Sequence, residues 1–235
     1  MPSQTNTIGM CGRYAYIGPI GGVRKLVVIG DWDWLPDSNY NISPTQEVPV
    51  LLKEREQIHI RHLHWGLIPF WAKDPKIGSR MINARSETLA EKPSFKNAFK
   101  KHRCLVLANG YYEWTGTKGD KQPYFITTLT DEPFGFAGLW ETWTDKDSET
   151  TIQSCTIITT EASPVIEHIH ERMPVILNPE IYQHWLDPEL QDLNELIGML
   201  EVGKVEEFKF YPVSRDVNST RNNRPDLMQP INLQE

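Results

Sequence analysis

The sequence predicts an α+β fold in which an antiparallel sheet system is surrounded by helices. Short runs of β-branched and aromatic residues fill the middle of the chain. Turn-forming residues such as Asn109-Gly110 and Asp131-Glu132-Pro133 separate these runs. Helical spacing of apolar residues is confined to a few segments. Together these features indicate strands joined by short turns, with helices packed around them.

Eight segments have the composition of strands. They are Val48–Lys53, Ile58–Trp65, Cys104–Ala108, Tyr111–Thr115, Tyr124–Leu129, Phe134–Trp140, Ile152–Thr159 and Phe208–Val213. Helical spacing is found in Ser86–Lys101, Ser163–His168, Pro179–Trp185 and Pro188–Leu200, and proline is favoured in the first turn of the last two. The tail from Ser214 to Glu235 is rich in Asn, Arg and Pro, and we expect an ordered loop over the surface.

Length and composition fit one globular domain. The chain has 235 residues, of which 39% are hydrophobic, and we expect residues 10–235 to form a single domain after an N-terminal extension of residues 1–9. Its apolar runs are far shorter than the ~20 residues that a membrane span needs. Residues 1–9 also lack the features of a secretory signal. A cytoplasmic protein with three thiols, rather than disulfides, is therefore expected.

Charge is distributed unevenly along the chain. The net charge of −7 argues against a protein that binds nucleic acid over its whole surface. Between Arg80 and Arg103, however, seven Lys or Arg face two Glu, whereas Glu180–Glu207 has eight acids and one lysine. This pattern predicts one face that binds a polyanion locally, although ordinary solvated helix faces would also account for it.

Cys11 follows Met10 in Met10-Cys11-Gly12-Arg13-Tyr14. If Met10 is a translation start, its removal gives Cys11 a free α-amine next to its thiol. An α-amine has a reference pKa of ~7.7–8.0, so it is partly neutral at physiological pH and forms a Schiff base with an aldehyde. The thiol then closes a thiazolidine ring. Cys104 and Cys155 lie in apolar strand runs and are expected to be buried.

Glu113 and His170 are the acid–base candidates. Glu113 lies in Gly110-Tyr111-Tyr112-Glu113-Trp114, where aromatic neighbours would raise the pKa of the carboxyl by desolvation. His170 lies in His168-Ile169-His170 before Glu171-Arg172-Met173-Pro174, and histidine moves protons in either direction near neutrality. From the residues alone, surface or packing roles remain open for both.

No metal or cofactor is expected. The pairs His62/His64 and His168/His170 lack a third ligand of suitable type, and no Gly-rich phosphate loop is present. Eight tryptophans are many, and Pro69-Phe70-Trp71 falls in a loop. Exposed aromatic rings there suit stacking on unpaired bases, with core packing as the competing interpretation.

In their order along the chain, these motifs resemble the SOS response-associated peptidase family. The resemblance runs from Met10 to Ile231. The further matching stretches are Tyr40-Asn41-Ile42-Ser43-Pro44, Trp65-Gly66-Leu67-Ile68-Pro69, Ile82-Asn83-Ala84-Arg85-Ser86-Glu87-Thr88, Gln122-Pro123-Tyr124, Ala137-Gly138-Leu139-Trp140, Ile169-His170-Glu171-Arg172-Met173-Pro174 and Pro212-Val213-Ser214. The resemblance implies a mixed, mainly antiparallel β core of barrel-like sheets with peripheral helices.

The resemblance also implies roles for individual residues. The nucleophile is Cys11, Asn83 has a positioning role, Glu113 does acid–base work and His170 shuttles protons. Arg13, Arg85 and Arg172 line a phosphate track, and Trp71 and Trp114 shape a single-strand channel. The implied activity is covalent capture of abasic sites in single-stranded DNA by a monomer without membrane or small-molecule cofactor, associated with the nucleoid when bound to DNA.

Residues 1–9 depart from the family pattern, because a Cys11 whose nitrogen is acylated has no amine to react. Either Met10 is the true start, or the segment is removed, or the chain is an inactive precursor. Two other functions stay open. A cysteine peptidase, which could release the N-terminal segment itself, needs the thiol but not the amine, and a non-catalytic single-strand binder needs neither.

Overall fold

The computed structural model describes residues 11–18, 37–117, 119–130, 132–202 and 207–233. The predicted extension, residues 1–9, lies outside the described residues. The strands in the described residues are β1 (Tyr14–Tyr16), β2 (Asn39–Ile42), β3 (Glu47–Glu54), β4 (Gln57–Trp65), β5 (Asn83–Arg85), β6 (Arg103–Ala108), β7 (Gly110–Thr117), β8 (Asp120–Thr128), β9 (Phe134–Thr144), β10 (Thr151–Glu161), β11 (Arg172–Pro174) and β12 (Phe208–Pro212).

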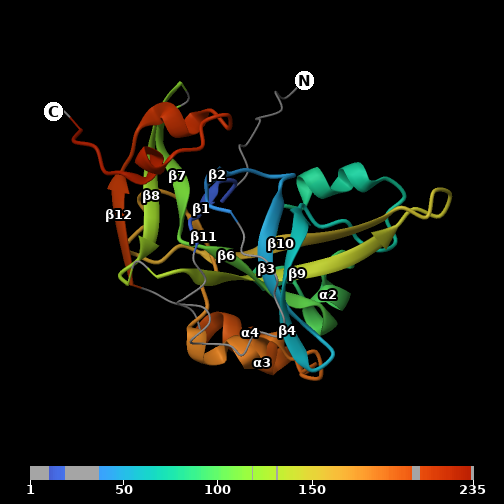
Figure 1. Ribbon diagram of the computed structural model, residues 1–235. Helices are drawn as coiled ribbons and strands as arrows, with labels where there is room; N and C mark the ends of the chain where they lie inside the picture. Colours follow the sequence, from blue (N-terminus) through green and yellow to red (C-terminus); the bar gives the residue numbers. More distant parts are fainter. Residues whose placement is uncertain (1–10, 19–36, 118, 131, 203–206, 234–235) are drawn as a thin grey trace, which may run out of the picture.

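Helices are few and short. The α-helices of the described part are α2 (Lys96–Lys101), α3 (Tyr182–Leu186) and α4 (Leu193–Val202), and the 3₁₀ turns are η1 (Pro75–Arg80), η2 (Ser86–Thr88), η3 (Pro179–Ile181), η4 (Arg215–Asn218) and η5 (Pro225–Met228). Helices α3 and α4 lie together at one end of the molecule, below the strands (Figure 1). None of the helices in the described ranges has the length and apolarity to cross a membrane.

Two sheets form the β core and confirm the predicted mixed, mainly antiparallel architecture. One sheet has the order β12-β8-β7-β1-β2. The other runs β11-β10-β4-β3-β6-β9, and because β10 also pairs with β9, strands β10, β4, β3, β6 and β9 close into a barrel-like ring. Strand β10 pairs in parallel with β4 and β5, whereas the other strand pairs are antiparallel.

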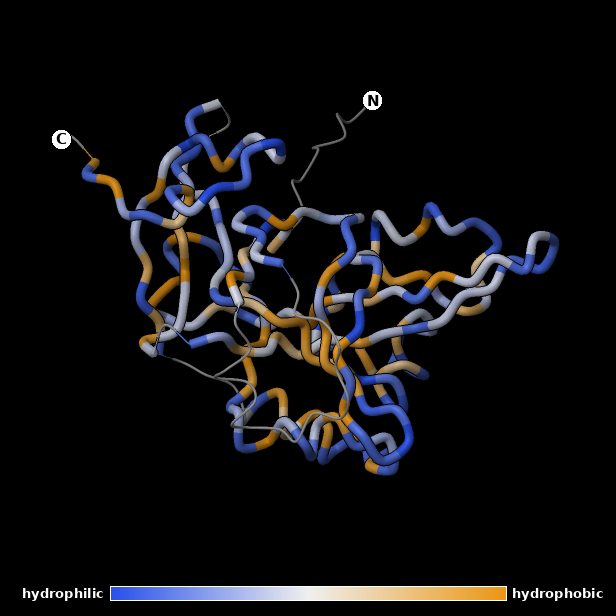
Figure 2. The backbone as a smooth tube through the Cα atoms, in the orientation of Figure 1, coloured by the Kyte–Doolittle hydropathy of each residue, from blue (hydrophilic) through white to orange (hydrophobic). Residues whose placement is uncertain are grey.

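The core lies inside the ring and between the two sheets. Figure 2 shows hydrophobic segments concentrated in the central strands and hydrophilic ones in the outer loops. Tyr14 of β1 meets Trp65 and Phe136 of the ring edge-on, with ring centroids 5.2 and 5.7 Å apart. Such edge-to-face contacts are favourable beyond the area they bury, so Tyr14 fixes the first sheet, and with it the nearby Cys11, against the ring.

Three of the predicted helices need correction. Ser86–Lys101 is not one helix, because Pro93 lacks an N–H and separates η2 from α2. Ser163–His168 forms only successive turns before the chain enters β11. These turns have few backbone hydrogen bonds, one of which runs from the N–H of Ile166 to the carbonyl of Ser163. The helix expected from Pro188 begins at Leu193. The Asp192 carboxylate caps it by accepting hydrogen bonds from the backbone N–H groups of Asn194 and Glu195.

The remaining strand and loop predictions agree with the structure to within a few residues. Strands β1, β2, β5 and β11 were not predicted, and each has only three or four residues. The C-terminal tail is the expected surface loop. It is fixed by the Asn41 amide, which donates to the carbonyls of Val217, Ser219 and Asn222 at 2.8–3.3 Å.

Candidate functional site

Pairing of β1 with β7 brings Cys11 to Glu113. Tyr14 lies opposite Tyr111 in this antiparallel pair, and the N–H of Tyr112 donates to the carbonyl of Arg13 at 2.9 Å. Continuing along the pair, the backbone nitrogen of Cys11 donates to Oε1 of Glu113 at 2.6 Å. Two sequence motifs that are 102 residues apart therefore form one site.

Cys11 is buried and its backbone is strained. The residue is 4% exposed. Its φ of +46° lies in the left-handed region, which costs a residue other than glycine on the order of 1–3 kcal/mol and is often found at functional sites. The strain involves the peptide bond that precedes Cys11, because φ is defined by the carbonyl carbon of the previous residue.

Burial sets the protonation of both groups. Desolvation raises the pKa of Glu113, although the charge that His170 carries when protonated and two hydrogen bonds from Cys11 act in the opposite direction. Burial, followed by the charge of Glu113 and a hydrogen bond to it, raises the pKa of the Cys11 thiol well above its ordinary value, and Arg172 offsets only part of this. The thiol is therefore protonated at neutral pH.

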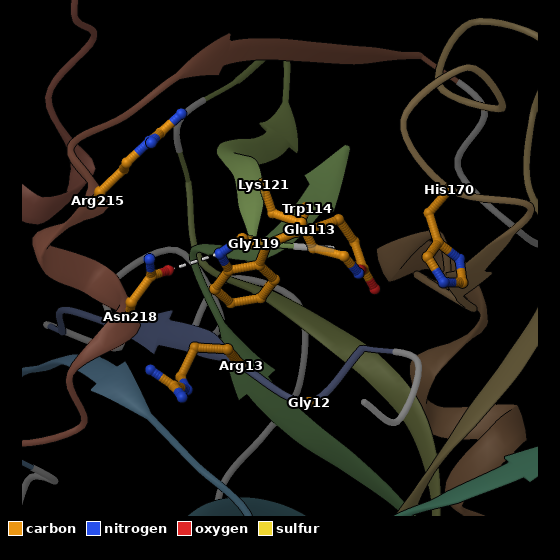
Figure 3. A pocket seen from close by; sticks show the side chains of 9 residues that line it. All are labelled: Gly12, Arg13, Glu113, Trp114, Gly119, Lys121, His170, Arg215 and Asn218. Carbon is orange, nitrogen blue, oxygen red and sulfur yellow. Dashed lines mark hydrogen bonds between the residues drawn. The ribbon is translucent and has the colours of Figure 1, made fainter. Parts of the chain in front are cut away.

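His170 completes this group from the segment between β10 and β11. The backbone N–H of Arg172 donates to Nδ1 of His170 at 3.1 Å. An Nδ1 that accepts this bond carries no proton, so the neutral ring has its proton on Nε2. His170 and Glu113 line the same cavity, and in Figure 3 the carboxylate of Glu113 lies on the side that faces the imidazole.

The cavity beside Glu113 has a volume of about 370 Å³. It is lined by Gly12, Arg13, Glu113, Trp114, Gly119, Lys121, His170, Arg215 and Asn218 (Figure 3). Arg13, Glu113, Trp114 and His170 are residues that the sequence singled out. Lys121, Arg215 and Asn218 were missed, because each resembles an ordinary surface residue until the fold places it at the cavity.

Arg13 and Trp114 are fixed against each other. The guanidinium of Arg13 donates to Oδ1 of Asn41 at 2.8 Å and to the carbonyl of Val217 at 2.7 Å. Its Cζ lies over the indole ring of Trp114, 5.9 Å from the ring centroid. The indole N–H of Trp114 donates to Oδ1 of Asn218 at 2.7 Å. The ring is thus held in one orientation at the cavity wall.

Arg172 and Arg85 lie around β10 instead. Arg172 is buried and donates to both carboxylate oxygens of Glu87 at 2.5 and 3.0 Å, and to the carbonyl of Thr159 at 2.9 Å. Arg85 is exposed at the end of β5. Both arginines line a second, more open groove of about 690 Å³. Glu87, the partner of Arg172, belongs to the same Ile82–Thr88 motif as Asn83 and Arg85, and its pairing with Arg172 was not predicted.

Other predicted residues are placed separately. Asn83 is half-buried at the start of β5, opposite Ile157 of β10. Trp71 and its neighbour Phe70 are exposed, at 49% and 57%, in the segment after β4, and neither lines the cavity beside Glu113. Arg103, counted in the basic stretch, is buried and donates to the carbonyls of Phe99 and Trp185, so it joins helices and adds nothing to a charged face.

The other two cysteines are buried and free, as predicted. Within the residues that the structure describes, no three His, Cys, Asp or Glu side chains gather in a way that could hold a metal ion. The groups that the site brings together are the backbone nitrogen and thiol of Cys11, the carboxylate of Glu113 and the imidazole of His170.

Fold and site together define a class of protein: a two-sheet α+β protein in which a buried cysteine and glutamate lie beside a half-buried histidine at the wall of a cationic cavity. The SOS response associated peptidase (SRAP) family model matches residues 10–220, and the chain belongs to this family. The resemblance recognised in the sequence is thereby confirmed.

Relatives of known name span nearly the whole chain. The abasic site processing protein YoqW of Bacillus subtilis is 38% identical over 94% of this chain and 99% of its own length. The abasic site processing protein YedK of Escherichia coli is 31% identical over 94% of this chain and all of its own. A crystal structure of a protein from Bacteroides thetaiotaomicron superimposes with a TM-score of 0.79 at 27% identity, covering 95% of this chain and 98% of that one.

Proposed function

We propose that the protein captures abasic sites in single-stranded DNA through Cys11 once this cysteine is the first residue of the chain. The observation that carries the proposal is the 2.6 Å bond from the Cys11 nitrogen to Glu113, beside the thiol of the same residue. Relatives that match nearly the whole chain are named abasic site processing proteins. The proposal assigns this chain the same class of target.

The reaction balances without a cofactor. An abasic deoxyribose opens to an aldehyde at C1′, and the amine of Cys11 adds to it. Loss of water gives the imine, and the thiol then adds to the imine carbon while its proton passes to the ring nitrogen. The amine and thiol lie on one residue, so ring closure needs no further encounter. Closure also protects the strand, because a lasting imine promotes elimination of the 3′ phosphate.

The state of the thiol supports a route that begins with the amine. A cysteine peptidase uses a thiolate, which needs a lowered pKa. Burial and Glu113 instead raise the pKa of the Cys11 thiol. In the proposed route the neutral thiol attacks an imine that is already activated, and Glu113 relays the proton of the thiol to the ring nitrogen. Peptidase action on other proteins is thus the less supported alternative.

Backbone strain supports a free Cys11. Without residue 10, Cys11 has no φ angle, and the strain of its left-handed conformation disappears. A start at Met10 with ordinary methionine removal, or cleavage of residues 1–10, would both give this product. We therefore propose that residues 1–10 are absent from the active protein, in which the single domain assigned to residues 10–235 begins at Cys11.

The proton on Nε2 suits His170 to donate to the sugar oxygen during ring opening, while Glu113 acts on the amine. Asn83 would position the sugar or the amine. Arg13, Arg85 and Arg172 would hold backbone phosphates, with Arg172 exchanging part of its contact with Glu87, and Trp71 and Trp114 would contact the unpaired bases. The active form is taken to be a monomer.

The test uses protein that begins at Cys11 and single-stranded DNA with one abasic site. A protein–DNA band that survives denaturation is expected, and Cys11→Ala should abolish it. Cys104→Ala and Cys155→Ala should leave it unchanged, because both thiols are buried away from the cavity. Failure of the parent to form any band would remove the proposal.

A second arm tests His170. Its replacement by alanine should slow capture by roughly 10²-fold or more, the usual contribution of a placed acid–base group. His184→Ala, an exposed histidine on α3, is the matched control and should react at the parent rate. Equal rates for both variants would make His170 a structural residue.

A further inference from the structure

We propose that the cavity beside Glu113 is a nucleotide subsite, in which Lys121 and Arg215 bind the phosphate of the nucleotide next to the abasic sugar and Trp114 stacks on its base. The inference rests on the proposed function for the nature of the ligand. It adds three residues, Lys121, Arg215 and Asn218, to which neither the sequence motifs nor the comparisons give a role.

The position of the cavity next to Cys11 indicates which nucleotide it would hold. Gly12, the residue after Cys11, and Glu113 both line it. A ligand there lies within one residue of the amine and thiol that react with C1′. The sugar's immediate neighbour on the strand is the group that reaches this space. At about 370 Å³ the cavity is within the range of small-ligand sites.

Charge distinguishes this cavity from the groove that holds Arg85 and Arg172. Three cations line the cavity, Arg13, Lys121 and Arg215, and Glu113 is the one acid among its lining residues in the described part. The groove instead contains three glutamates besides its two arginines, namely Glu161, Glu167 and Glu171. Clefts lined by one sign of charge concentrate ligands of the other sign. The cavity is therefore the stronger phosphate site.

Two cations of the cavity, Lys121 and Arg215, are available to bind a phosphate. Lys121 is half-buried on β8 opposite Gly116, and within the described ranges its side-chain ammonium makes no hydrogen bond or ion pair. Arg215 pairs with Asp120 at 2.6 Å, but both side chains are more than half exposed. Exposed pairs of this kind contribute little, so a phosphate exchanges with Asp120 at small cost.

The indole ring of Trp114 is positioned to stack on a base. Asn218 holds its indole N–H and Arg13 lies over its ring, so the ring loses little freedom on binding. The side chain is half-buried at the cavity wall. Bases of any kind stack on such a ring, so this contact would not select one base over another.

The experiment measures noncovalent binding of a short single-stranded oligonucleotide that carries a tetrahydrofuran in place of the abasic sugar, so it cannot cross-link. One neighbouring phosphate at a time, 5′ or 3′, is replaced by an uncharged methylphosphonate. The parent protein should lose affinity most for one of these two probes. Lys121→Gln should bind the unmodified probe more weakly and be insensitive to that same replacement.

Trp114→Leu should weaken binding by about five- to a hundredfold, the range for one stacked base. Lys146→Gln, at the exposed β9–β10 turn, changes the net charge equally and should bind as the parent does. The salt dependence of Lys121→Gln should be shallower by ~0.7 in slope.

The subsite is wrong if Lys121→Gln loses affinity by the same factor for every probe, or if it binds the probes as tightly as Lys146→Gln does. This conclusion holds even if the parent protein still cross-links to abasic DNA. If the coupling appears in a parent protein that forms no cross-link, the subsite stands and covalent capture is what fails. Binding and cross-linking are separate readouts, so the two failures are distinguishable.

Discussion

Cys11 and Glu113 are joined twice. The backbone nitrogen of Cys11 donates to the carboxylate at 2.6 Å, and the thiol of the same residue is hydrogen-bonded to it as well. One buried carboxylate therefore contacts both atoms that the proposed reaction uses. Its pKa is raised by desolvation, so it gives up and takes protons closer to neutrality than an exposed glutamate does.

Glu113→Gln tests this double contact through kinetics. Glutamine keeps the size and the acceptor oxygen of glutamate but has no proton to exchange. We expect capture of abasic DNA to slow by ~10²–10⁴-fold, while affinity for undamaged single strand stays within a factor of about two. Single-turnover time courses beside a binding titration measure both. Equal slowing and weakening would instead indicate a structural role.

The same variant makes a prediction about stability and pH in the chain whose Cys11 is in a peptide bond. Because burial raises the pKa of Glu113 above its ordinary value of 4.5, the folded chain binds a proton more tightly than the unfolded chain. The free energy of unfolding then falls as pH rises from that value through the raised pKa. Glutamine carries no charge, so the stability of Glu113→Gln relative to the parent should increase in thermal melts as pH rises from about 4.5 through the raised pKa of Glu113. A difference independent of pH would contradict the buried-carboxylate assignment.

Binding should depend on salt and on strand type. If Arg13, Arg85 and Arg172 neutralise about three phosphates, log affinity falls with log salt at a slope near −2, at ~0.7 per phosphate. Contributions from Lys121 and Arg215 would make the slope steeper. Intact duplex should bind more weakly, because stacking needs unpaired bases. Titrations at several salt concentrations decide this, and equal affinity for duplex and single strand would count against the channel.

Two glycines give opposite predictions for stability. A Cβ at Gly110 would lie 2.2 Å from the Phe125 ring and 2.8 Å from the carbonyl of Ile126, so Gly110→Ala should destabilise the fold by ~1–3 kcal/mol. A Cβ at Gly198 in α4 would meet nothing within 4 Å, so Gly198→Ala should stabilise by ~0.5–1 kcal/mol. Urea unfolding checks both signs, and destabilisation by the second variant would show that α4 packs differently.

Local patterns were sufficient to predict the long strands, because alternation and turn residues act over a few positions. Strand β5 is different: its three residues, Asn83–Arg85, carry no periodicity and become a strand only by pairing with β10. The same holds for β11 at Arg172–Pro174. Pairings between distant segments decide such elements, and no single window of sequence contains them.

The candidate site divides in a similar way. Cys11, Glu113 and His170 were recognisable through their chemistry and their motifs. Lys121 and Arg215 were not, because a lysine in a strand and an arginine in a tail look like ordinary surface residues until β7, β8 and η4 place them around one cavity. The ion pair between Glu87 and Arg172 could not be predicted from the sequence, because ion pairs depend on distance in space.

The most direct test of the central claim is the intact mass of the product formed by protein that begins at Cys11 and abasic single-stranded DNA, compared with the same protein acetylated at its N-terminus. The free protein should give an adduct whose mass is the sum of both partners less one water, unchanged by borohydride because the ring contains no imine. The acetylated protein should give none. An adduct that forms equally well with an acetylated N-terminus would show that the amine of Cys11 is not the capturing group.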